Sequence, residues 1–108
     1  RIEGKGEYSS IQKAIDNAID GDKIIIKSGT YQEKLTINKS ISLIASDLKS
    51  TYIKYNNNTE ISIIRLNADN CVISGFIISG NNQTRGVNGI EVISSNNSIL
   101  NNKIEISY

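Results

Sequence analysis

The chain repeats one short pattern, in which three to five residues that suit a β-strand are followed by a polar corner. Ile occupies 22 of the 108 positions and Asn occupies 14. Ile is among the best strand formers and Asn among the poorest, whereas Asn is well suited to turns. We therefore expect Ile to be buried within short strands, and Asn to stack on Asn where the chain turns.

The pattern recurs every 27 to 31 residues, which is the range of structural repeats. At a shift of 27, Asn70–Ser74 aligns with Asn97–Asn101. The few Leu residues are not periodic, and a single helical segment cannot supply helical repeats, so a β-solenoid is the predicted architecture. Further aligned pairs are Ile63 with Ile90, Ile77 with Ile104, Ile37 with Leu66, and Ile41 with Val72.

Residues 9–20 form the one segment with helical periodicity. Ser9 and Gln12 fit a capping box at its start, and Gly21 suits its end. Because a solenoid end exposes apolar core and unpaired strand edges, this amphipathic helix is predicted to close that end. The apolar stripe of the helix is Ile11, Ala14, Ile15, Ala18 and Ile19.

The strand after the helix contains Ile24, Ile25 and Ile26 in succession. Three consecutive Ile residues predict a strand that is covered on both faces. We expect the helix to cover one face and the core to cover the other.

Composition excludes several classes of site. There is no His and no Met, and Cys71 is the single Cys, so a disulfide within the chain, a His-based relay and a soft-metal or copper site are excluded. We expect no cofactor and no metal. The formal net charge is +1 with both signs interspersed, which argues against a nucleic-acid partner, and no apolar run is long enough to span a membrane.

The order of motifs resembles the opening of the pectin lyase-like superfamily of right-handed parallel β-helix proteins. The part from Asp69 to Ser107 is similar to the carbohydrate-binding and sugar-hydrolysis repeat of that superfamily. Within the superfamily, the sequence most resembles archaeal and bacterial surface proteins with parallel β-helix repeats. The motifs that carry the resemblance are Ser10–Gln12 with Ala14 and Ile15, Gly21–Asp22, Ile24–Ile26, Gly29–Tyr31 with Glu33, and Leu35–Ile37.

This resemblance implies an all-β fold, a right-handed parallel β-helix with an N-terminal amphipathic cap helix. We expect one domain over residues 1–108, with the helix over 9–20 and the coils over 23–108, as the capped beginning of a longer solenoid. Pectin methylesterases share the corner formed by Gly29, Tyr31, Glu33 and Lys34. Their catalytic residues lie in later coils, so the resemblance assigns no catalytic residue here.

Carboxylate pairs are candidate catalytic groups because glycoside hydrolysis needs two carboxyl groups about 5 to 9 Å apart. Asp69 and Glu91 are separated by 22 residues, which is less than one repeat, so they are not predicted to stack. Asp20 and Asp22 flank Gly21 and fit turn chemistry. The sequence therefore favours structural roles for both pairs.

The candidate carbohydrate-binding residues are Arg65, Arg85 and Asn82. A guanidinium group suits an acidic sugar, and an amide both donates and accepts hydrogen bonds. Each of the three also fits an ordinary solvent-facing position. The polar corners at 56–58 and 81–83 are the loops that would touch a glycan. Glycosylation sequons begin at Asn38, Asn57, Asn82 and Asn96 and reflect composition unless the protein is secreted.

Three tyrosines are candidates for stacking against sugar rings. Tyr52 and Tyr55 are three residues apart in a strand, so they are predicted to face opposite sides. Tyr31 is expected to belong to the corner of the fold. Cys71 is expected to be a small buried apolar side chain, and Phe76 a core residue.

Two functions follow from these observations. The first is a non-catalytic module of a secreted or cell-surface protein, which binds carbohydrate or is adhesin-like. The alternative is the N-terminal part of a polysaccharide-active enzyme, of the pectinesterase or polysaccharide lyase type, with its active site in coils beyond this sequence. The expected location is extracellular or at the cell surface. The expected partners are a polysaccharide or glycan, and a second copy bound end to end through the open C-terminal coil.

Overall fold

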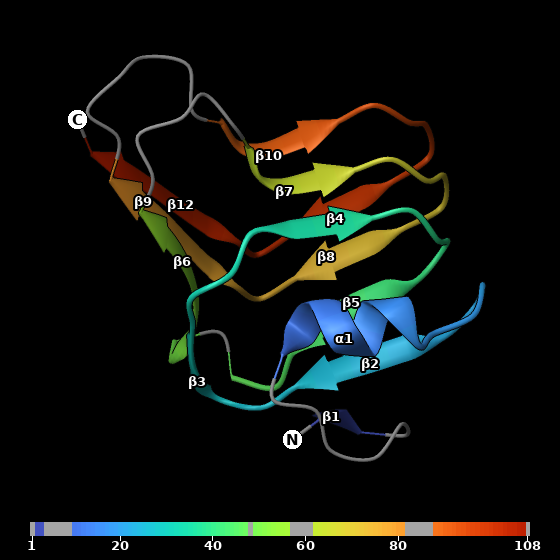
Figure 1. The fold of residues 1–108 in the computed structure, drawn as a ribbon, viewed down its shortest axis with the longest axis horizontal. Coiled ribbons are helices and arrows are strands. Elements are labelled where there is room, and N and C mark those ends of the chain that lie inside the picture. The colour runs from blue at the N-terminus through green and yellow to red at the C-terminus, as the bar shows by residue number, and fades with distance from the viewer. Residues whose placement is uncertain (1, 4–9, 48, 57–61, 82–87, 108) are drawn as a thin grey trace.

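The computed structural model describes residues 2–3, 10–47, 49–56, 62–81 and 88–107 (Figure 1). Strands account for 51% of the structure, so the predicted all-β class is confirmed. The elements in chain order are β1 (Ile2–Glu3), α1 (Ile11–Asp16), β2 (Lys23–Ile26), β3 (Gly29–Tyr31), β4 (Leu35–Ile37), β5 (Ser42–Ala45), β6 (Thr51–Asn56), β7 (Ser62–Leu66), β8 (Val72–Ser74), β9 (Ile77–Asn81), β10 (Asn88–Val92), β11 (Ser98–Leu100) and β12 (Lys103–Ser107).

The strands form three sheets, and every third strand from β2 onward joins the same sheet. Sheet A has the order β1-β2-β5-β8-β11, sheet B the order β12-β9-β6-β3, and sheet C the order β10-β7-β4. All neighbours pair in parallel except β1, which runs antiparallel to β2. The chain therefore passes through sheets C, A and B in turn and then begins again.

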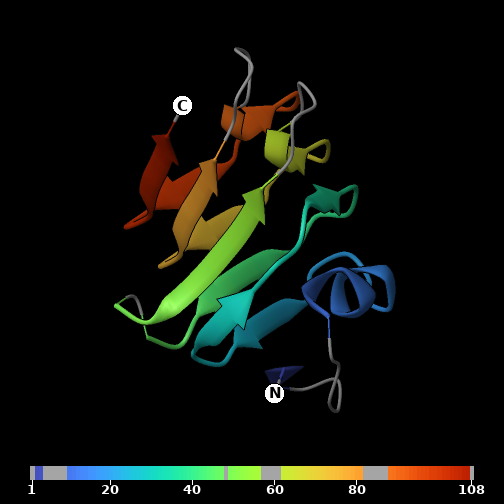
Figure 2. The ribbon, with the colours of Figure 1, turned by 60° about the vertical axis from the view of Figure 1, so that its left-hand side comes forward.

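Each passage through the three sheets forms one layer of the molecule. Layer 1 contains α1, β2 and β3, layer 2 contains β4 to β6, layer 3 contains β7 to β9, and layer 4 contains β10 to β12. The layers follow one another from blue to red in Figure 2. In layer 1, α1 stands where a fourth strand of sheet C would lie.

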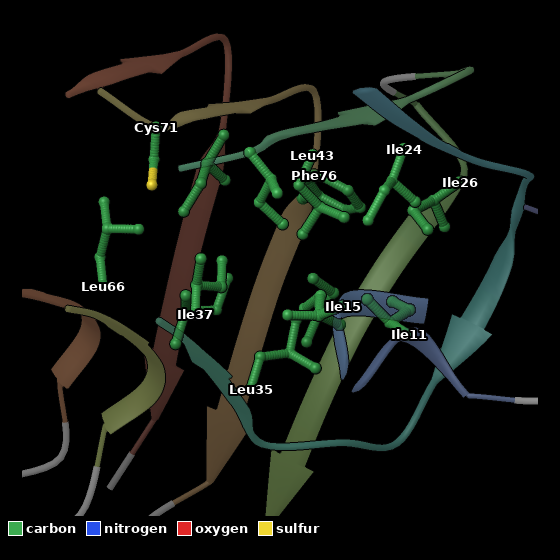
Figure 3. Packing of buried hydrophobic residues seen from close by; sticks show 14 of the residues in the cluster. Ile11, Ile15, Ile24, Ile26, Leu35, Ile37, Leu43, Leu66, Cys71 and Phe76 are labelled. Carbon is green, nitrogen blue, oxygen red and sulfur yellow. The ribbon is translucent and has the colours of Figure 1, made fainter. Parts of the chain in front are cut away.

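The core lies between the three sheets and is built from columns of aliphatic residues. In sheet A, Ile24 pairs in register with Leu43, and Leu43 with Ile73. All three are 0% exposed, as are Ile11 and Ile15 of α1, which belong to the same buried cluster (Figure 3). Burial of each such side chain contributes about 1.5–3 kcal/mol, so these columns are the main source of stability.

The helix is shorter than the sequence predicts. It ends at Asp16 rather than near residue 20, and its N-cap is Ser10, whose Oγ accepts a hydrogen bond from the Lys13 N–H. The predicted N-cap Ser9 lies outside the described residues. Ile19 was expected in the apolar stripe but is 67% exposed. Gly21 has φ +92° and lies in the turn before β2, so its left-handed conformation serves that turn and not the helix end.

The prediction that the helix and the core cover opposite faces of β2 is wrong. Ile24 and Ile26 are buried in the same cluster as the helix residues. Ile25 is only half-buried, because the alternation of the strand turns it to the outer face of sheet A. Helix and core therefore lie on one side of β2.

The alignment at a shift of 27 is wrong by one residue. Ile73 pairs with Ile99 and Ile78 with Ile104, a shift of 26. Ile63 likewise does not pair with Ile90, because Ile90 pairs with Ile64. Ile occupies outer as well as inner positions, so residue type alone does not fix the register.

Two further pairs test the longer shifts. Ile37 pairs with Leu66, which confirms the shift of 29. Val72 pairs with Ser42 and not with Ile41, so the shift of 31 is also wrong by one residue.

The Asn residues at the corners have two separate roles. Asn70 and Asn96 have φ near +60°, a left-handed conformation that Asn tolerates better than most residues. Asn97 lies one layer beyond Cys71, and its Oδ1 accepts the Cys71 N–H at 2.9 Å. Asn102 Oδ1 accepts the Phe76 N–H, also at 2.9 Å. At these corners the Asn side chains therefore bond to the backbone of the neighbouring layer.

Candidate interaction surfaces

The described carboxylates serve mainly as acceptors for backbone N–H groups. Asp69 Oδ1 accepts the Ser95 N–H at 2.8 Å, and Glu91 Oε1 accepts the Ser62 hydroxyl at 2.9 Å. Asp69 thus lies in the corner between β7 and β8, whereas Glu91 lies on β10 of sheet C. Within the described ranges, no group of three or more His, Cys, Asp or Glu side chains lies close enough to hold a metal ion.

The second carboxylate pair fixes the turn between α1 and β2. Asp22 Oδ2 accepts the Ile19 N–H at 2.9 Å, and Asp20 Oδ1 accepts the Ser40 N–H at 2.9 Å. This arrangement agrees with the predicted turn chemistry. Asp20 also ties the turn of layer 1 to the corner that precedes β5.

Of the three candidate carbohydrate-binding residues, the structure describes Arg65. It is exposed on β7, and its register neighbours are Thr36 on β4 and Glu91 on β10. We call Thr36, Arg65 and Glu91 the polar row of sheet C. Arg85 and Asn82 lie outside the described residues, as do most of the polar corners at 56–58 and 81–83.

The polar row presents a hydroxyl, a guanidinium and a carboxylate on three neighbouring parallel strands. Such strands are spaced about 4.8 Å apart, so the row offers donors and acceptors in a line. Sugar hydroxyl groups both donate and accept, and a guanidinium group also pairs with a carboxylate of an acidic sugar. The row is therefore the best candidate for carbohydrate contact among the described residues.

The tyrosines do not form one platform, as predicted. Lys54 Nζ lies 5.7 Å from the centre of the Tyr52 ring on the outer face of sheet B. Tyr55 packs against the core from the other side. Tyr31 also packs against the core, and its hydroxyl donates to the Lys27 carbonyl at 2.6 Å. Burial, followed by the nearby Glu33 charge, raises the pKa of Tyr31, which agrees with a structural role.

Cys71 is buried, as predicted, and 1% exposed. Its Sγ lies 3.2 Å from the Lys39 carbonyl and 3.4 Å from the Ala68 carbonyl. Burial is the main cause that raises the pKa of this thiol, so the reactive thiolate is disfavoured at neutral pH. Phe76 is 0% exposed and belongs to the core, as predicted.

Glu33 has a role at the N-terminus of α1 that the sequence does not predict. Oε1 accepts hydrogen bonds from Ser10 Oγ at 2.7 Å and from the Gln12 N–H at 3.1 Å, and Oε2 accepts the Ile11 N–H at 2.8 Å. A carboxylate is favoured at this end of a helix by the free N–H groups and by the dipole. The sequence placed Glu33 in a corner motif, and no local signal linked it to a helix 22 residues earlier.

Lys39 has the matching role at the other end of the helix and was also missed. Its Nζ donates to the carbonyl oxygens of Ile15 at 3.1 Å, Asp16 at 2.6 Å and Ala18 at 2.8 Å. Glu33 and Lys39 flank β4, so this one strand positions both charges. We call this pair the helix clamp.

Gln12 joins α1 to the free edge of β4. Its Nε2 donates to the Thr36 carbonyl at 3.0 Å, and its Oε1 accepts the Thr36 N–H at 2.8 Å. The side-chain amide thus makes the pair of bonds that a neighbouring strand would make. The predicted capping box assigned Gln12 to the helix start instead.

Two of the four glycosylation sequons begin at described residues. Asn38 and Asn96 are both exposed. The sequons that begin at Asn57 and Asn82 lie outside the described residues.

No helix in the described part of the chain is both long enough and apolar enough to cross a membrane. No family model matches the sequence. The chain is 35% identical, over 104 residues, to a protein of Methanothermus fervidus named cell surface glycoprotein. The match covers 94% of the chain but only 16% of that much longer relative. This relative supports the expected extracellular or cell-surface location.

Proposed function

We propose that the chain is a non-catalytic right-handed parallel β-helix module of a secreted or cell-surface protein, and that it binds carbohydrate. The observation that carries the proposal is that most of the described carboxylates bind groups of the fold itself. Glu33, Asp20, Asp22 and Asp69 each accept backbone N–H groups, so they hold the fold together. A glycosidase instead needs two carboxyl groups that face one substrate.

The β-helix architecture is supported by the order in which the chain visits the sheets. Each strand from β4 onward pairs in parallel with the strand three places earlier or later. Parallel strands joined through a crossover are right-handed in nearly all proteins, which supports the right-handed form. Such a stack suits a stalk or an adhesin-like surface module, because it presents outer side chains in regular rows.

Carbohydrate binding is assigned to the polar row of sheet C. Arg65 is its exposed centre, with Thr36 and Glu91 as register neighbours. The Ser62 hydroxyl donates to Glu91 Oε1 at 2.9 Å, which holds the carboxylate in one position on β10. A site of this kind, without an aromatic ring, binds weakly and favours acidic sugars.

A glycan array that includes acidic polysaccharide fragments tests the proposal with the purified chain. We expect binding that falls at least about tenfold in Arg65→Ala, because a charged hydrogen bond contributes about 1.5–3 kcal/mol. Lys23→Ala, which removes an exposed cation from sheet A, is the matched control and should leave binding unchanged.

Three outcomes count against this function. Absence of binding to any glycan excludes the carbohydrate assignment, and equal loss in Arg65→Ala and Lys23→Ala excludes the polar row. Release of new reducing ends from a polysaccharide by the purified chain excludes the non-catalytic assignment.

A further inference from the structure

Layer 4 exposes aliphatic side chains in columns that are buried in the layers beneath it. Ile99 is 40% exposed, whereas its register partner Ile73 is 0% exposed. Ile104 is 49% exposed over Ile78 at 0%. The remaining columns that open in layer 4 are Ile37–Leu66–Val92, with Val92 46% exposed, and Leu35–Ile64–Ile90, with Ile90 only partly buried.

The structure itself shows what covers such a surface. The equivalent surface of layer 3 is covered by layer 4, through parallel pairing in all three sheets at a shift of 26 residues. Two corner amides complete this interface, because Asn97 accepts the Cys71 N–H and Asn102 accepts the Phe76 N–H. The contact between layers is therefore an established interface with a defined chemistry.

We propose that the exposed side of layer 4 is a binding surface for one further layer of the same kind. This partner supplies three short strands that pair in parallel with β10, β11 and β12. It carries large aliphatic residues over Ile90, Val92, Ile99 and Ile104. It also places Asn or a similar polar side chain over each of Asn97 and Asn102, as these two residues themselves lie over Cys71 and Phe76 of layer 3.

A second copy of the chain fits this surface less well. The far end of the molecule does not offer three free strands, because β1 already pairs with β2 in sheet A and Gln12 of α1 bonds to the edge of β4 in sheet C. A second copy can therefore bind only head to head, layer 4 against layer 4, with the strands of the two copies antiparallel. Its Asn97 and Asn102 amides already bond to its own layer 3, so it brings no corner groups.

The proposal is tested by appending a second copy of residues 83–108 after Tyr108, which keeps the 26-residue spacing. Amide hydrogen exchange of Ile99 and Ile104 and the Tm are measured in the parent and the extended chain. The matched control carries the same extension with Asp at the copied positions of Ile90, Ile99 and Ile104. The proposal rests on the stacking of the layers and not on glycan binding, so a negative glycan array leaves it unaffected.

We expect exchange of both amides to slow at least about tenfold in the extended chain, and the Tm to rise by about 4 °C or more. The control should show neither change. Unchanged exchange in the extended chain, equal slowing in the control, or loss of protection at Leu43 and Ile73 overturns the proposal. A second copy is the occupant instead if the parent sediments as a dimer, the amides of layer 4 are protected in that dimer, and Ile99→Asp converts it to a monomer. That result overturns the proposal.

Discussion

The two ends of the layered structure are built differently. At the first end, β1 pairs with the edge of sheet A, and Gln12 bonds to the edge of sheet C. At the second end, β10, β11 and β12 are the outermost strands, and aliphatic residues of the core columns are 40–49% exposed. The contrast teaches that closing an end requires side chains that do not repeat, whereas the repeat by itself only produces a surface for another layer.

The largest expected difference between buried and open layers lies within one column of sheet A. Ile73→Ala should lower the free energy of unfolding by about 2–5 kcal/mol, because it leaves a cavity in a fully buried site. Ile99→Ala, one layer further, should cost less than about 1 kcal/mol because its side chain is already 40% exposed. Urea unfolding measures both, and equal costs would show that layer 4 is covered in solution.

The closed end depends next on Glu33. Glu33→Ala should cost about 1–3 kcal/mol, because it leaves the first N–H groups of α1 without their acceptor. Glu33→Gln keeps an acceptor oxygen and should cost less. Lys34→Ala, at the exposed neighbouring position, is the control. If Lys34→Ala and Glu33→Ala have the same effect on urea unfolding, the helix clamp does not stabilise this end.

The other half of the helix clamp should have a smaller effect. Lys39→Met removes the donor to three carbonyl groups of α1 and should cost about 1 kcal/mol. Since the contact involves a charge at the helix C-terminus, the cost should shrink in high salt. Thermal unfolding with and without 1 M NaCl measures it, with Lys23→Met as the exposed control. A cost that does not change with salt would assign the effect to packing of the side chain.

The smallest expected effect concerns the buried thiol between the two ends. Burial raises the pKa of Cys71, so the folded chain keeps the thiol proton to a higher pH than the unfolded chain. The stability linked to this proton is present below the ordinary thiol pKa of about 8.5 and is lost as the pH rises above it. Between pH 7 and pH 9.5 the free energy of unfolding should therefore fall less in Cys71→Ala than in the parent. The difference between the two falls should be below about 1 kcal/mol. Identical pH profiles from urea unfolding would contradict this.

Several features were predictable because they depend on local patterns. Short strands rich in Ile and corners rich in Asn follow from the conformational preferences of those residues. The opposite directions of Tyr52 and Tyr55 follow from the alternation of a strand. The burial of Cys71 and Phe76 follows from their apolar character and their places beside strands.

The candidate site was less predictable. The sequence selected Arg65 as an exposed cation, but its neighbours Thr36 and Glu91 come from other layers and emerge only from the register. The roles of Glu33 and Lys39 were missed for the same reason. Each acts on a helix that is more than 20 residues away in the sequence and beside it in space.

The sequence alone determined that this protein is built from short strands joined by polar corners. It determined this because strand and turn preferences are properties of single residues and their immediate neighbours. Only the tertiary structure decided the register, the place of α1 beside β4 of sheet C, and the exposure of the columns at Ile99 and Ile104. A shift of one residue moves every side chain to the opposite face, and a sequence with Ile on both faces does not forbid that shift.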